Sequence, residues 1–213
     1  MYVVTADQVD SRTDVDRSEA MRDHLQERFG DVLRLPVDQT AGDELQLLTA
    51  DAEAAVDVIL ELARDGHWSI GLGVGEVREP LPDAVRKATG EAFFAAREAV
   101  EAAKRADARF ALRAPSSDAV PVPPDDVEAI ARLLLLLRDR RTAQGWEAVD
   151  LVRDGRSQKD AAERLGISDA AVSQRLRTAM WSADADARPA LVRLVAMLDA
   201  TPDPNPGQMR RTT

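Results

Sequence analysis

Residues 158–177 read QKDAAERLGISDAAVSQRLR and contain the strongest local pattern in the chain. Two helices that cross at a steep angle need a small residue where they touch, and Ala162 supplies one. The sharp turn between them needs a residue that tolerates a positive φ angle, and Gly166 follows at the right distance. Ser168 can then cap the next helix through its hydroxyl. The stretch therefore predicts a helix-turn-helix, with residues 146–181 as the complete three-helix unit.

The second helix of this stretch separates into an inward and an outward face. Val172 and Leu176, four residues apart, anchor the inward face. On the outward face, Gln can bond an adenine edge and Arg a guanine edge, while Ser, Lys and Arg can contact phosphate. We therefore expect a DNA-binding surface made of Ser168, Asp169, Ala170, Ser173, Gln174, Arg177, Lys159 and Arg156.

This run resembles the helix-turn-helix segments of the sigma-factor region-four and LuxR types. The resemblance implies sequence-specific DNA binding by a regulator of transcription. The alternative is a helical hairpin that docks on protein or never meets DNA, which Asp169 slightly favours because its carboxylate would repel phosphate. Since a single helix-turn-helix seldom provides enough affinity, we also expect a homodimer that binds paired half-sites.

The composition is that of a soluble globular protein, with 45% hydrophobic and 31% charged residues in a chain of 213. The net charge of −10 argues against a non-specific nucleic-acid coat, but it leaves room for a local cationic face. The chain has no cysteine, which excludes a disulfide framework and a thiolate metal site and favours the cytoplasm. The N-terminus lacks a signal-peptide pattern and no apolar run could span a bilayer, so we expect no membrane partner.

The stretch APSSDAVPVPP at residues 114–124 contains four prolines and predicts an extended linker between two domains. Residues 1–113 are expected to form an α/β domain, and residues 125–213 an all-α domain that contains the helix-turn-helix. Five consecutive leucines at residues 133–137 place apolar side chains all round one helix. This helix is either a central core element or a dimer interface.

Before the linker, apolar periodicity alternates between strand and helix patterns. The order β-α-β-β-α-β-α-β predicts one sheet with helices packed against it. Strands are expected at residues 2–6, 32–40, 45–48, 68–75 and 110–113, and helices at residues 16–29, 51–64 and 84–105. Gly71, Gly73 and Gly75 occupy alternate positions of one strand, which indicates close approach by another backbone or by a ligand.

A further resemblance depends on four segments, which are TADQVDSR at residues 5–12, AGDELQ at 41–46, GLGVG at 71–75 and GEAFFAAREA at 90–99. On these segments the chain resembles the SatD family over essentially its full length. Families of this kind join such an N-terminal domain to a C-terminal helix-turn-helix. The resemblance therefore implies the same two-part architecture here.

More distantly, the same segments resemble the catalytic core of class III nucleotidyl cyclases and the related GGDEF palm. That likeness implies an α+β, ferredoxin- or cyclase-like sheet in which Asp7 and Asp43 hold Mg²⁺ against a nucleoside triphosphate, as hard oxygen ligands would. It also implies a nucleotide-binding role for Ser11, Arg12, Gly42 and Arg97. Phe93 and Phe94 occupy the region where the cyclase helix carries an Asn, so a transition state for cyclisation would lack one stabilising partner.

The ordinary alternatives are that Asp7 solvates a strand end, Asp43 is a turn residue and Arg97 lies on a solvated helix face. We assign no catalytic residue and favour a DNA-binding transcriptional regulator, whose N-terminal domain senses a nucleotide-like ligand or mediates dimerisation. The competing hypotheses are a divalent-metal-dependent nucleotide-binding or cyclase-like enzyme, and a protein–protein adaptor.

Overall fold

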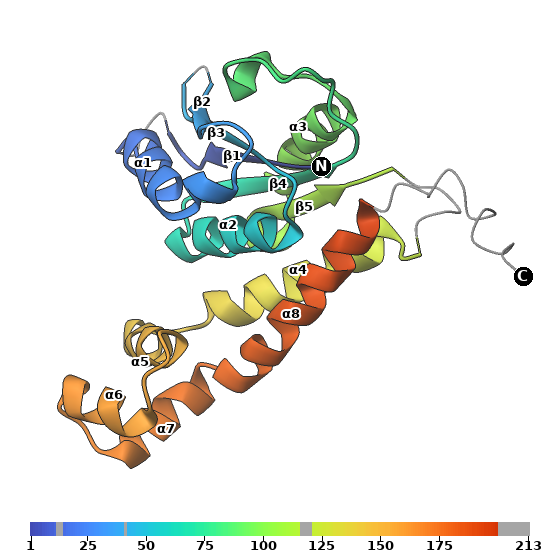
Figure 1. Ribbon diagram of the computed structural model, residues 1–213. Helices are drawn as coiled ribbons and strands as arrows, with labels where there is room; N and C mark the ends of the chain where they lie inside the picture. The colour runs from blue at the N-terminus through green and yellow to red at the C-terminus, as the bar shows by residue number, and fades with distance from the viewer. Residues whose placement is uncertain (12–14, 41, 116–120, 200–213) are drawn as a thin grey trace, which may run out of the picture.

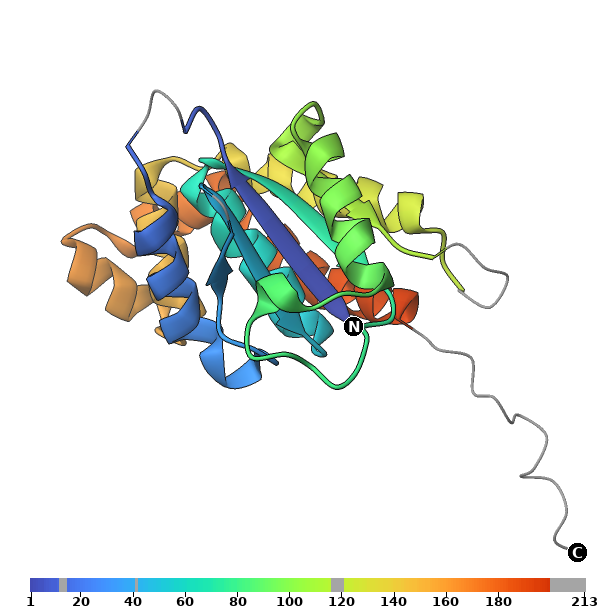
Figure 2. The same ribbon diagram turned by 90° about the horizontal axis from the view of Figure 1, so that it is seen from above.

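The computed structural model describes residues 1–11, 15–40, 42–115 and 121–199 of the chain. These residues form a mixed α/β structure in which helices cover both faces of a five-stranded sheet (Figure 1, Figure 2). The strands are β1 (Tyr2–Gln8), β2 (Asp38–Gln39), β3 (Glu44–Thr49), β4 (Trp68–Val74) and β5 (Phe110–Arg113). The helices are α1 (Ser18–Phe29), α2 (Ala52–Asp65), α3 (Glu91–Ala103), α4 (Pro124–Asp139), α5 (Ala143–Arg153), α6 (Gln158–Leu165), α7 (Asp169–Thr178) and α8 (Trp181–Leu198).

β1 lies at the centre of the sheet, whose strand order is β2-β3-β1-β4-β5. It pairs antiparallel with β3, where Tyr2 lies opposite Thr49, and antiparallel with β4, where Tyr2 lies opposite Val74. β2 pairs antiparallel with β3, whereas β5 joins β4 in parallel. A strand with neighbours on both sides and helices on both faces has no solvent-facing side, which explains the nearly continuous run YVVTA at residues 2–6.

α2 lies between the sheet and the pair formed by α4 and α8 (Figure 1). The Asp51 carboxylate caps its first turn by accepting a hydrogen bond from the Glu53 amide, and Gly66 ends it with a φ of 81°. Because the sheet packs on one side of α2 while α4 and α8 pack on the other, most of its apolar side chains are buried. α1 covers the same face of the sheet through Leu25 and Phe29.

α3 covers the opposite face of the sheet and packs mainly on β4. A Cβ at Gly71 would overlap backbone atoms of Ala96 and Val100, and a Cβ at Gly73 would overlap those of Ala92 and Ala96. The expected close approach by another backbone is therefore confirmed for these two glycines. The approaching backbone is α3, whose alanines allow the short distance.

Two expected elements are shorter than the sequence indicates. The helix expected at residues 84–105 begins only at Glu91, because Gly90 adopts a φ of 148° and a Cβ there would overlap the backbone of the preceding loop. The strand expected at residues 32–40 contracts to β2, since Pro36 cannot donate a ladder hydrogen bond.

The hydrophobic core continues past the linker predicted at residues 114–124. Buried side chains of α4 and α8 belong to the same cluster as those of the sheet, and they are Val127, Ala131, Leu134, Leu135, Leu191, Val195 and Leu198. A separate, smaller cluster holds α5, α6 and α7 together at the far end of the α4–α8 pair (Figure 1). The helices after the linker are thus divided between two cores.

The five leucines of α4 face different surroundings. Leu134 and Leu135 are buried and Leu137 is half-buried, whereas Leu133 is 64% exposed and Leu136 is 40% exposed. A role as a core helix accounts for the buried leucines but not for the exposed ones. Neither α4 nor any other described helix is long and apolar enough to cross a membrane.

Candidate nucleic-acid interface

α6 begins at a reciprocal cap and ends at a glycine turn. Ser157 Oγ accepts a hydrogen bond from the Asp160 amide at 3.1 Å, and the Ser157 hydroxyl and amide donate to Asp160 Oδ2 at 2.7 and 3.3 Å. The two hydrogen bonds that Ser157 donates to Asp160 Oδ2 hold the pKa of Asp160 below its usual value. At the other end, Gly166 adopts a left-handed φ of 65° and turns the chain into α7, as predicted.

α7 is fixed by its cap and by two buried anchors. Ser168 Oγ accepts a hydrogen bond from the Ala171 amide at 3.2 Å. Val172 and Leu176 are 0% and 6% exposed and pack against small side chains of α5 and α6, among them Ala162. The predicted cap, small contact residue and inward anchors are all confirmed.

The opposite face of α7 is open to solvent. Asp169, Ala170, Gln174 and Arg177 are exposed, while Ser173 is half-buried at the edge of this face. Arg177 Nη2 donates a hydrogen bond to Gln174 Oε1 at 2.7 Å. The two longest polar side chains that α7 contributes to the expected surface therefore lie side by side.

The surroundings of this face are mildly cationic. Lys159 and Arg156 are exposed at the start of α6. Between residues 156 and 177 the cations are Arg156, Lys159, Arg164, Arg175 and Arg177, and the acids are Asp160, Glu163 and Asp169. This segment thus has a surplus of two positive charges in a chain whose net charge is −10, although Arg175 is paired with Glu147 at 3.1 Å. A local surplus of this sign is what a phosphate backbone attracts.

Trp146 of α5 attaches this three-helix unit to the rest of the molecule. The guanidinium carbons of Arg64, Arg138 and Arg141 lie 4.3, 5.0 and 4.7 Å from the ring centroid of Trp146. Arg64, which belongs to α2, also makes a bidentate ion pair with Asp150 of α5, at 2.8 and 2.7 Å. The orientation of α5 is therefore set by contacts with both α2 and α4.

Asp184 of α8 forms the centre of a buried ion cluster beside this tryptophan. Its side chain is 3% exposed and accepts hydrogen bonds from Arg138 Nη1 and Arg141 Nη2, both at 2.8 Å. Burial lowers the pKa of Arg138, and the Asp184 carboxylate opposes that shift. Without this carboxylate, two cations would remain in a buried position with much less compensation.

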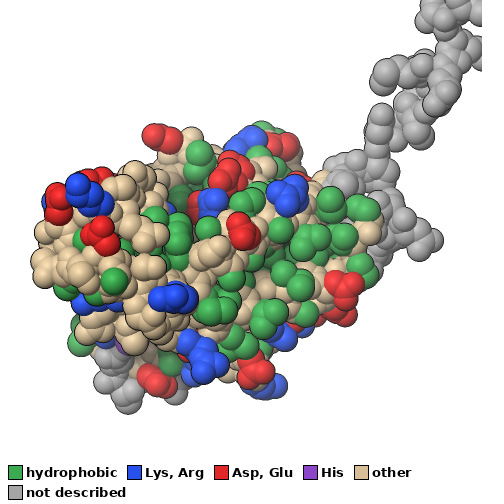
Figure 3. Space-filling model, turned by 90° about the horizontal axis from the view of Figure 1, so that it is seen from below, with side chains coloured by type: hydrophobic (Ala, Val, Ile, Leu, Met, Phe, Trp, Pro, Cys, Tyr) green, Lys and Arg blue, Asp and Glu red, His purple; other side chains and the backbone are tan. Residues whose placement is uncertain are grey.

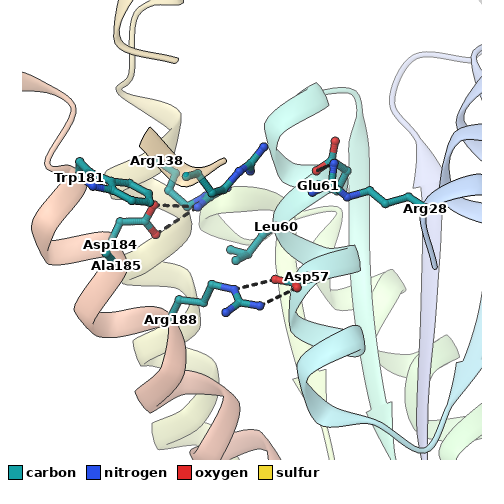
Figure 4. Close-up of a pocket in the computed structure, with 10 residues that line it drawn as sticks. Arg28, Asp57, Leu60, Glu61, Arg138, Trp181, Asp184, Ala185 and Arg188 are labelled. Carbon is teal, nitrogen blue, oxygen red and sulfur yellow. Dashed lines mark hydrogen bonds and ion pairs between the residues drawn. The ribbon is translucent and has the colours of Figure 1, made fainter. Parts of the chain in front are cut away.

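A cavity of about 330 Å³ lies between α2 and α8, next to the ion cluster (Figure 4). Figure 4 shows Arg188 directed at Asp57 and Arg138 directed at Asp184. Four arginines and three carboxylates line the cavity, and each arginine pairs with a carboxylate, since Arg28 also meets Glu61 at 3.9 Å and Arg153 meets Asp150 at 3.2 Å. The lining therefore differs from the group of unpaired cations that a phosphate group requires.

The two carboxylates predicted as metal ligands have different neighbours. Asp7, near the end of β1, pairs with Lys104 Nζ at 3.1 Å. Asp43 lies in the turn before β3, and its carbonyl oxygen accepts a hydrogen bond from the Gln8 amide at 3.3 Å. Among the residues that the structure describes, no group of three His, Cys, Asp or Glu side chains is placed to hold a metal ion. Lys104 therefore supplies the positive charge that balances the Asp7 carboxylate.

The residues predicted to bind a nucleotide lie in two places, because Ser11 and Gly42 flank the end of the β1–β3 pair where Asp7 lies opposite Glu44, whereas Arg97 is on α3. Ser11 is half-buried in the turn after β1, and Gly42 has a φ of 91° in the turn between β2 and β3. Arg97 lies on the exposed face of α3, away from the sheet, and this helix packs mainly on β4 on the other side of β1. Arg12 lies outside the described residues.

No family model, curated protein or solved structure matches this chain. The site must therefore be interpreted from its own residues. The sequence does not single out five charged residues that hold the three-helix unit in place, which are Arg64, Arg138, Arg141, Asp150 and Asp184. The one sequence signal for these residues is Trp146, which follows shortly after a group of arginines at the end of the leucine run.

Proposed function

We propose that the chain is a DNA-binding regulator of transcription, in which α6 and α7 form a helix-turn-helix supported by α5. The observation that supports this most directly is the outward side of α7. Gln174 and Arg177 are exposed together, opposite the buried anchors Val172 and Leu176. A helix of this kind enters the major groove and contacts base edges from its exposed face.

In the proposed complex each exposed side chain has a chemical role. Arg177 contacts a guanine edge and Gln174 an adenine edge, and the hydrogen bond between them aligns both toward the groove. Lys159 and Arg156 contact phosphates. Asp169, at the start of α7, is suited to accept a hydrogen bond from a cytosine amino group rather than to approach a phosphate. Ser168, Ala170 and Ser173 border these contacts.

Selection of duplexes from a random-sequence library, followed by anisotropy titrations over a range of salt concentrations, tests the proposal. We expect an enriched motif and an affinity that falls as salt rises. Arg177→Ala should weaken binding by about 1–3 kcal/mol and relax selection at one base position. Lys159→Ala should weaken binding to all sequences evenly and reduce the salt slope by about 1.

The matched control is Arg105→Ala, which removes an exposed arginine just after α3 in the sheet unit and should leave binding unchanged. The proposal fails if the full chain at micromolar concentration does not bind duplex DNA in low salt. It also fails if Arg177→Ala selects the same motif with the same affinity.

We also propose that the sheet unit is ferredoxin-like and that the two-part architecture is that of SatD proteins. The antiparallel order β2-β3-β1-β4, with α1 and α2 on one face, supports the first part. The helical unit that follows the sheet supports the second. We do not extend the proposal to nucleotide or Mg²⁺ chemistry, because Lys104 pairs with Asp7 and Arg97 lies away from the Gly42 turn.

A further inference from the structure

α4 turns an apolar stripe toward solvent. Ile130 is 45% exposed, Leu133 64% and Leu136 40%, with exposed Ala129 and half-buried Leu137 beside them. The opposite side of the same helix packs into the large core. An apolar stripe on an outward helix face gains hydrophobic free energy only when another surface covers it.

The stripe belongs to a wider apolar surface. Figure 3 shows hydrophobic side chains gathered over α4 and α8 on this face of the molecule. On α8, Met197 is 40% exposed and Leu194 is half-buried. A contiguous patch that spans two neighbouring helices is typical of a protein interface rather than of scattered surface residues.

Charges of opposite sign lie at the two ends of the stripe. Asp126 lies seven residues before Leu133, and Arg140 lies seven residues after it, and both are exposed. Seven residues are close to two helical turns, so all three side chains lie on one side of α4. A stripe that is acidic at one end and basic at the other complements a second copy of itself running in the opposite direction.

We propose that α4 binds α4 of a second copy of this chain, antiparallel, about a two-fold axis at Leu133. This arrangement places Ile130 opposite Leu136 of the partner subunit and Asp126 opposite Arg140 of the partner subunit, and symmetry repeats both pairs. Parallel helices would instead bring like charges together, and their helix dipoles would oppose the pairing. The interface does not depend on DNA binding, but it would supply two α7 helices for paired half-sites.

Sedimentation equilibrium of the full chain, with circular dichroism to check the fold, tests the interface. Leu133→Asp should weaken dimerisation at least about a hundredfold, because it removes two buried leucines and inserts two carboxylates at the axis. The matched control is Phe94→Asp, which makes the same chemical change at a residue 71% exposed on α3 and should leave the dimer intact.

A charge-reversal cycle tests the antiparallel direction. Asp126→Arg and Arg140→Asp should each weaken the dimer by about tenfold, because each places like charges opposite one another in two symmetric pairs. The double variant should recover most of that loss, since the pairs are restored with their signs exchanged.

Because the chain has no cysteine, a single Leu133→Cys protein provides an independent measurement. Oxidation should cross-link the two subunits at the axis, whereas Phe94→Cys should not cross-link. A full chain that stays monomeric at high micromolar concentration overturns the proposal, as does a dimer that Leu133→Asp leaves intact. A folded, monomeric Leu133→Asp protein that still binds one DNA half-site would support both proposals separately.

Discussion

The two hydrophobic cores that contain the helices after the linker are built differently. The larger one joins the sheet to α1, α2, α4 and α8 and contains Trp68, Phe110 and many branched aliphatic side chains. The smaller one, in α5–α7, is built largely from alanine around Val172 and Leu176. Large side chains determine how the larger core packs. In the smaller core, most fully buried side chains are small and the bulkier ones, such as Trp146 and Trp181, are only half-buried, so its shape depends also on helix caps, on the turn at Gly166 and on its attachment through ions to the larger core.

The largest effect is expected at the ion cluster that joins the two cores. Asp184→Ala leaves Arg138 and Arg141 buried without their carboxylate and should lower the free energy of unfolding by about 3–5 kcal/mol. Denaturant titration measures this free energy of unfolding. Asp186→Ala, an exposed position on the same helix, should change it by less than about 0.5 kcal/mol. Equal stability of the two variants would mean that the cluster does not hold the cores together.

A smaller effect is expected inside the alanine-rich core. Val172→Ala removes two methyl groups from a fully buried site and should cost about 2 kcal/mol. Native-state hydrogen exchange should then show faster exchange of the α6 and α7 amides, while β1 amides exchange at the wild-type rate. Val4→Ala in β1 is the matched change in the larger core and should accelerate exchange across the sheet. If Val172→Ala accelerates β1 equally, the two cores unfold as one unit.

The smallest effect concerns the cap of α6. The pKa of Asp160 is lowered in the folded protein by hydrogen bonds from Ser157, so its carboxylate stabilises the fold above the usual aspartate pKa. That contribution is lost as the pH falls through the lowered value. The difference in melting temperature between wild type and Asp160→Asn should therefore be present at pH 7 and shrink in acid. In a Ser157→Ala background, which keeps only the hydrogen bond from the residue 157 amide, the same substitution should depend less on pH.

Local patterns in the sequence predicted local structure well. The turn at Gly166, the cap at Ser168 and the order of strands and helices each depend on residues close together in the chain, where intrinsic preferences apply. The start of α3 lies later than expected, because the alanine-rich helix pattern of residues 91–103 does not extend back over residues 84–90. There the chain forms only a 3-10 turn at Val85–Lys87, and the backbone packed against Gly90 does not permit a continuous helix.

Pairs distant in sequence could not be predicted in this way. Arg64 and Asp150 lie on different helices, as do Arg138 and Asp184, and a single sequence does not record which charged residues meet. The pairing of Asp7 with Lys104 likewise depends on how α3 ends over the sheet. Packing between layers determines these contacts, and they set the chemistry near each predicted site.

The sequence alone determined which segments become helix or strand and which side of α7 stays polar, because side-chain periodicity and capping act within a few residues. The tertiary structure alone decided that α4 and α8 share a core with the sheet, leaving half of the leucine-rich helix uncovered. The physical reason is that an apolar side chain favours burial wherever burial is available. Which face of a uniformly apolar helix is covered therefore depends on the neighbours that the rest of the fold supplies.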